Sequence, residues 1–131
     1  IVVGPSGVFV IDAKKYKGRP NLRIEGGLFR PRIETLMVGS RDCTTLADRA
    51  LKQVAQVASA LAAAGIHDLP TAGMLCFVEA DWPLLGGNFT TRGVEVLWPA
   101  KAMERMQKPG PLDDTGIAAA ARALAAHFPT A

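Results

Sequence analysis

An acidic and a basic residue, Asp12 and Lys14, stand two positions apart at the end of an apolar run that begins at Val8. Alternate side chains of a β-strand share a face, so this spacing predicts that the two charges project together where the strand leaves the core. A carboxylate is an oxygen ligand of the kind that Mg²⁺ prefers, and a neighbouring lysine can orient a water or stabilise charge on a phosphoryl group. The pair therefore suits metal-assisted hydrolysis of a phosphodiester. The simpler alternative is a strand end whose charges are only solvated.

A second set of polar residues recurs at helical spacing: Arg49, Lys52, Gln53 and Gln56. They share one face of a long helix that is predicted from Thr44 or Thr45 to Ala64 and ends before Gly65. Such a face normally points to solvent. If the helix packs beside the Asp12 strand, however, Gln53 and Lys52 would reach a bound phosphate or the attacking water.

Basic residues also gather directly after the strand: Lys14, Lys15, Lys17, Arg19 and Arg23. The whole chain has 15 Lys and Arg against 12 Asp and Glu, and this net charge of +3 permits a polyanionic partner without requiring one. We expect Lys15, Lys17, Arg19 and Lys52 to contact a nucleic-acid backbone, with Tyr16 as a further candidate. A solvated loop explains the same cluster equally well.

Other residues that could do chemistry carry weaker signals. Glu79 and Asp81 follow the apolar stretch that ends at Val78, so they could bind a metal or simply begin a polar loop. The two cysteines, Cys43 and Cys76, have no spacing typical of a zinc site. They are expected to be ordinary reduced thiols.

The elements that must position these residues alternate between strands and helices. Strands are predicted over 1–3, 8–13, 22–24, 33–38, 73–78 and 94–98, and helices over 44–64, 100–107 and from Asp113 or Asp114 to about His127. Gly4-Pro5-Ser6-Gly7 predicts a turn that joins the first two strands as a hairpin, whereas residues 82–92 are predicted to be a loop. This order predicts an α/β fold in which a mixed central sheet is flanked by helices.

The size and composition of the chain agree with a folded protein. It has 131 residues, of which 49% are apolar, and we expect a single domain over residues 1–131. The sequence contains no run of about 18 apolar residues, so we expect no membrane association and a cytoplasmic location. The chain starts at Ile1 without methionine, as though it were entered partway through a strand.

The opening string GPSGVFVIDAKKYKG, from Gly4 to Gly18, resembles the central signature of the nuclease-related domain (NERD) family. This family is placed in the PD-(D/E)XK, or restriction-endonuclease-like, superfamily. Asp12-Ala13-Lys14 matches the family's acid-x-lysine step, and Tyr16-Lys17-Gly18 matches the tail that follows it. The later helix, the FVEADWP stretch and the segment from Val94 to Pro99 are also similar.

The resemblance implies a restriction-endonuclease-like fold and a nuclease that uses Mg²⁺ or Mn²⁺, with DNA favoured over RNA as the substrate. Asp12 would bind the metal, Lys14 would orient the attacking water or stabilise developing charge, and Gln53 would support the site. The resemblance further implies a first aspartate one or two positions before Ile1, preceded by a helix. Two carboxylates normally share the metal in this family, and this chain shows one of them.

Two alternatives to a nuclease follow from that difference. The chain could be a non-catalytic module that binds nucleic acid through its basic loop. It could also be a structural or interaction domain, in which an exposed edge strand pairs with another chain.

Overall fold

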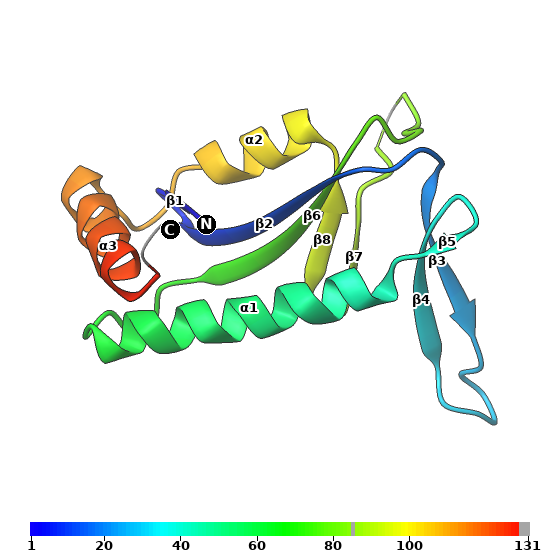
Figure 1. Ribbon diagram of the computed structural model, residues 1–131, viewed down its shortest axis with the longest axis horizontal. Helices are drawn as coiled ribbons and strands as arrows, with labels where there is room; N and C mark the ends of the chain where they lie inside the picture. The colour runs from blue at the N-terminus through cyan, green and yellow to red at the C-terminus, as the bar shows by residue number, and fades with distance from the viewer. Residues whose placement is uncertain (85, 129–131) are drawn as a thin grey trace.

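A five-stranded mixed sheet, in the order β1-β2-β6-β8-β7, forms the centre of the molecule (Figure 1). The computed structural model describes residues 1–84 and 86–128. The strands are β1 (Val2–Gly4), β2 (Gly7–Lys15), β6 (Thr71–Val78), β8 (Val94–Leu97) and β7 (Phe89–Thr91). β2, β6 and β8 run parallel, and β1 and β7 pair antiparallel at the two sides. The predicted α/β class and the hairpin of β1 with β2 are confirmed.

Three helices flank this sheet, as predicted. α1 (Thr44–Ala63) lies along one face and contacts β2, β6 and β8, and α2 (Pro99–Gln107) covers the other face (Figure 1). α3 (Asp114–His127) packs against α1 and β1. Turn chemistry explains the boundaries. Pro99 occupies the first helical position of α2, and the Asp113 carboxylate caps α3 by accepting a hydrogen bond from the Gly116 N–H at 2.8 Å.

The central strand β2 is apolar on both faces because each face is covered by a helix layer. Val8 and Val10 pack with Val57 of α1, whereas Phe9 packs with Ala102 of α2. This arrangement is expected for a strand in the parallel part of an α/β sheet. The α1 face of β2 therefore carries the even-numbered residues.

Small residues let α1 lie close to the sheet. A Cβ added at Gly73 of β6 would come within 3.2 Å of Val54 and 3.6 Å of Ala50, both on α1. The spacing of apolar residues in the sequence predicts that α1 buries Leu46, Ala50, Val54, Val57, Ala58 and Leu61. This prediction is largely right, but Ala58 is exposed, and Ala47 and Ala60, which it omits, are buried. The side chain of alanine carries too little apolar surface for the pattern alone to assign its face.

A separate antiparallel sheet stands beside the main one. It is formed by β3 (Pro20–Glu25), β4 (Ile33–Val38) and β5 (Arg41–Asp42). We call residues 20–38, the β3–β4 hairpin, the arm. The strands predicted over 22–24 and 33–38, with a turn or bulge at Gly26-Gly27 between them, are confirmed as this hairpin. The two-residue β5 and the three-residue β7 were missed, and β7 lies inside the predicted loop.

The start of α1 contains a titratable hydrogen bond. The Asp42 carboxylate accepts from the Thr44 N–H at 2.9 Å. Hydrogen bonds from the Thr44 backbone and hydroxyl, together with the charges of Arg23 and Arg92, lower the pKa of Asp42 below its usual value of 3.8. Because the folded-state pKa is the lower one, this contribution to stability is complete above about pH 4 and is lost as the pH falls through the folded-state pKa.

We therefore expect Asp42→Ala to lower the midpoint of thermal unfolding at pH 7, by an amount that shrinks as the pH is lowered toward 2. Melting curves followed by circular dichroism would measure this. Asp42→Asn is the matched control, because its amide oxygen can still accept from the Thr44 N–H but does not titrate. A loss of stability from Asp42→Ala that is equally large at pH 2 and pH 7 would contradict the assignment.

Candidate functional site

Asp12 and Lys14 lie together on the α1 face of β2. The Lys14 Nζ atom is 3.5 Å from Asp12 Oδ1, and the two side chains are 36% and 32% exposed, respectively. Across the sheet their partners in register are Leu75 and Phe77 of β6, both fully buried. The predicted common face is confirmed. The pair stands where the core ends and solvent begins.

Within the described residues, β1 pairs with only the first part of β2. Residues Val2–Gly4 pair only with Gly7–Phe9, so no strand among the described residues pairs with the outer edge of β2 from Val10 to Lys15. On its other side β2 is paired with β6 as far as Val78. The charged pair itself is about one third exposed.

α1 brings Gln53 to this face of the sheet. Gln53 and Gln56 line a pocket of about 310 Å³ together with Val10 and Ile11 of β2. Val10 precedes Asp12 by two residues, which is about 7 Å along the same face of the strand. The exposed Gln53 side chain thus lies on the same side of the sheet as Asp12, and none of the described contacts joins it to Asp12 or Lys14, so its role stays a prediction.

Lys52 is directed elsewhere, although it adjoins Gln53 in sequence. It borders a different hollow, with Ser59 and His127 among the lining residues. Nothing in the described contacts brings Lys52 to Asp12. Successive helical residues are separated by about 100° around the axis, so one of the two can face the sheet while the other faces solvent.

The three other predicted nucleic-acid contacts lie on the surface near the end of β2. Lys15 is on the opposite face of the strand from Lys14, and its Nζ atom is 3.7 Å from Glu79 Oε1. Both side chains are more than half exposed, so this ion pair adds little stability. Lys17 and Arg19 are exposed in the connection that leads to the arm.

Tyr16 has a structural role that the sequence did not reveal. Its ring centroid is 6.0 Å from that of Phe77, and the guanidinium of Arg41 lies 4.3 Å from the Tyr16 centroid. The tyrosine expected to touch nucleic acid is therefore packed between the core and a residue of β5.

The basic surface extends beyond Arg23 through three residues that sequence reasoning overlooked: Arg30, Arg32 and Arg41. The Arg30-Pro31-Arg32 triplet was the signal that could have revealed it.

The residues at the site were tested for their fit to a metal ion. Among residues 1–84 and 86–128, no group of three or more His, Cys, Asp and Glu could hold a metal. Of the weaker candidates, Glu79 is engaged by Lys15. The partly exposed Asp12 carboxylate fits an ion such as Mg²⁺, which is commonly held by one or two carboxylates together with waters and substrate phosphates.

The cysteines do not contribute a reactive group. Cys43 packs in the α1-side core and Cys76 in the α2-side core, so the two thiols lie in different layers. Burial raises the pKa of both thiols. A thiol that stays protonated is a poor nucleophile and a poor metal ligand.

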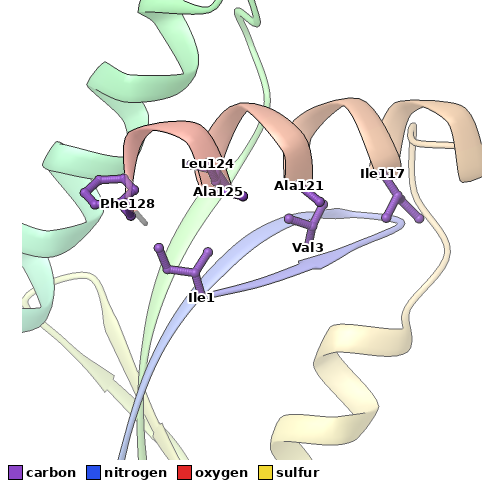
Figure 2. Close-up of a pocket in the computed structure, with 7 residues that line it drawn as sticks. All are labelled: Ile1, Val3, Ile117, Ala121, Leu124, Ala125 and Phe128. Atoms are coloured by element: carbon purple, nitrogen blue, oxygen red, sulfur yellow. The ribbon is translucent and has the colours of Figure 1, made fainter. Parts of the chain in front are cut away.

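A hollow of about 610 Å³ lies between β1 and α3 (Figure 2). The side chains that line it are all apolar: Ile1, Val3, Ile117, Ala121, Leu124, Ala125 and Phe128. It offers no charged or nucleophilic group. The edge at Asp12 and Lys14 is therefore the better candidate for chemistry.

Comparisons of the chain with protein-family models, with curated proteins and with solved structures returned no match. The family resemblance of the opening string thus stays a prediction. Within the described part of the chain, no helix has the length and apolar character needed to cross a membrane.

Proposed function

We propose that the chain hydrolyses phosphodiester bonds of DNA with the help of Mg²⁺ or Mn²⁺, as a nuclease-related domain with a restriction-endonuclease-like fold. The observation that carries this proposal is the 3.5 Å pair of Asp12 and Lys14 at the carboxyl end of a central parallel strand. Functional groups of open α/β sheets concentrate at that end of the strands. The acid-x-lysine signature supports the same reading.

Each residue has a role that follows from its chemistry. Asp12 would hold the ion, and Lys14 would orient the attacking water or stabilise the charge that develops on the phosphoryl oxygens. The Gln53 amide, which can donate and accept, would support a water beside them. A bound divalent ion supplies charge neutralisation and a more acidic water.

The register of the β1–β2 hairpin fixes where a second carboxylate would have to lie. Val3 pairs with Val8 and Val2 with Phe9, so a strand that continued upstream would place the residue two positions before Ile1 opposite Asp12. Residues directly opposite in an antiparallel pair share a face. This position agrees with the first aspartate that the family resemblance implies.

Cleavage of supercoiled plasmid DNA tests the proposal. We expect nicking in the presence of Mg²⁺ or Mn²⁺, its loss with EDTA, and its loss in Asp12→Asn, which removes the charge that binds the ion. Asp68→Asn is the matched control. Asp68 is exposed in the turn before β6, at the end of that strand far from Asp12. Asparagine also tolerates the φ of 62° that the backbone has at this position. The control should cut normally. Absence of metal-dependent cleavage, with salt-sensitive DNA binding retained, would instead establish a non-catalytic binding module.

A further inference from the structure

The tip of the arm exposes two large apolar side chains. Leu28 is 86% exposed and Phe29 is 94% exposed, in the turn between β3 and β4. Figure 1 shows this turn projecting away from the main sheet and its helices. Ile24 and Ile33, about half exposed, follow the tip toward the body on opposite faces of the hairpin. Large apolar side chains exposed side by side, as at the tip, commonly mark an interaction site.

The chain around this tip is strongly basic. From Lys14 to Arg41 there are eight basic residues and two acidic ones, whereas the rest of the chain has seven basic and ten acidic residues. Both acids of the segment are paired with arginines, Glu25 with Arg23 at 3.2 Å and Glu34 with Arg32 at 3.1 Å. Among the described residues no ion pair involves Arg30. The segment is thus complementary in charge to a polyanion, unlike the remainder of the molecule.

The base of the arm is held firmly against the body. Leu36 and Val38 are buried in the core under α1. The Thr44 hydroxyl accepts from the Leu36 N–H at 3.0 Å, and Arg92 donates to the Glu34 carbonyl at 3.2 Å. The arm is therefore anchored at its base, while its tip extends away from the body and is free to contact a ligand.

The tip itself is a defined turn. The Gly27 N–H donates to the Arg30 carbonyl at 2.8 Å, and Gly26 has a φ of 77°. A Cβ at Gly26 would lie 2.3 Å from the Pro31 carbonyl oxygen, so only glycine fits there. The turn therefore presents Leu28 and Phe29 outward in a fixed arrangement.

We propose that the arm is a wedge for double-stranded DNA, in which its arginines contact phosphates and Leu28 and Phe29 insert between base steps. Apolar side chains flanked by arginine act in this way in proteins that bind the minor groove. The choice of DNA rests on the proposed function, because the arm continues directly from the strand that carries Asp12 and Lys14. The six residues of β3 span about 20 Å, so the tip lies about that far from the base of the arm.

Binding to a fluorescent 30-base-pair duplex in EDTA, followed by anisotropy over a range of salt concentrations, tests the wedge without cleavage. We expect Leu28→Ser and Phe29→Ser each to weaken binding about tenfold with an unchanged salt dependence. Met103→Ser is the matched control, because Met103 is half exposed on α2, away from the arm. This variant should bind the duplex as the unmodified chain does. In a duplex labelled with 2-aminopurine, fluorescence should rise with the unmodified chain and not with Phe29→Ser.

The arginines are tested by the salt dependence itself. Arg30→Gln should reduce the slope of log affinity against log salt by about 1, whereas Arg122→Gln, the same change in exposed α3 surface, should not. Normal DNA binding by the Leu28 and Phe29 variants would overturn the wedge. The wedge would also be overturned if the Leu28 and Phe29 variants lost binding only to vesicles of phosphatidylserine and phosphatidylcholine, because the arm would then contact a membrane.

The two proposals fail separately in these experiments. An unmodified chain that binds through the arm but never cuts with metal overturns the proposed hydrolysis alone. A chain that cuts, with arm variants that bind normally, overturns the wedge alone.

Discussion

Replacing Lys14 with alanine should reduce metal-dependent cleavage of DNA by at least about 100-fold, which is typical for removing one group that stabilises charge in the transition state. The side chain is 36% exposed and its ion pair with Asp12 is 3.5 Å long. Truncation therefore opens no cavity, and the midpoint of thermal unfolding should not change. Initial rates of plasmid nicking, measured at saturating DNA, would give the loss in kcat.

Lys15→Ala is the matched control for this prediction. It removes the same charge from the next residue, but Lys15 lies on the opposite face of β2 and pairs with Glu79. We expect its kcat to stay within about threefold of the unmodified chain, while its DNA affinity falls modestly and more so at low salt. Equal losses in kcat from both variants would mean that the two lysines contribute only general positive charge, and the assigned role of Lys14 would be wrong.

Sequence alone predicted the relation between Asp12 and Lys14 because a strand's side-chain period of two is a local property. The starts of α2 and α3 were predictable for a similar reason, since Pro99 favours the first helical position and Asp113 caps the N–H groups that directly follow it. The arm was recognisable from two apolar stretches separated by Gly26-Gly27. Each of these features depends on chemistry within a few residues.

The remaining features depend on contacts between distant segments. Gln53 rather than Lys52 borders the pocket beside Val10 because close packing at Gly73 sets the rotation of α1. Tyr16 lies in a basic loop by sequence, yet Phe77 and Arg41 enclose it. Tertiary packing decided both cases, so local reasoning could not predict them.

The largest loss of stability is expected from Phe77→Ala in β6. Phe77 is 1% exposed, pairs in register with Lys14, and packs against Tyr16. Removing a buried phenylalanine costs about 3–5 kcal/mol through lost burial and the cavity left behind. This is a large part of the 5–15 kcal/mol that typically stabilises a domain. Urea unfolding curves would measure the change, and Phe77→Leu, with an expected cost of about 1 kcal/mol, remains measurable if the alanine variant does not fold.

Phe29→Ala provides the comparison, because it makes the same truncation in a side chain that is 94% exposed. Its free energy of unfolding should stay within about 0.5 kcal/mol of the unmodified chain. The two phenylalanines thus separate the core from the arm: one should determine stability, and the other should affect DNA binding alone. Similar losses of unfolding free energy in the Phe77→Ala and Phe29→Ala variants would contradict this separation. Either the α1 face of β6 would not be packed as described, or the arm would fold back onto the body. In the second case the tip would not be free to act as a wedge.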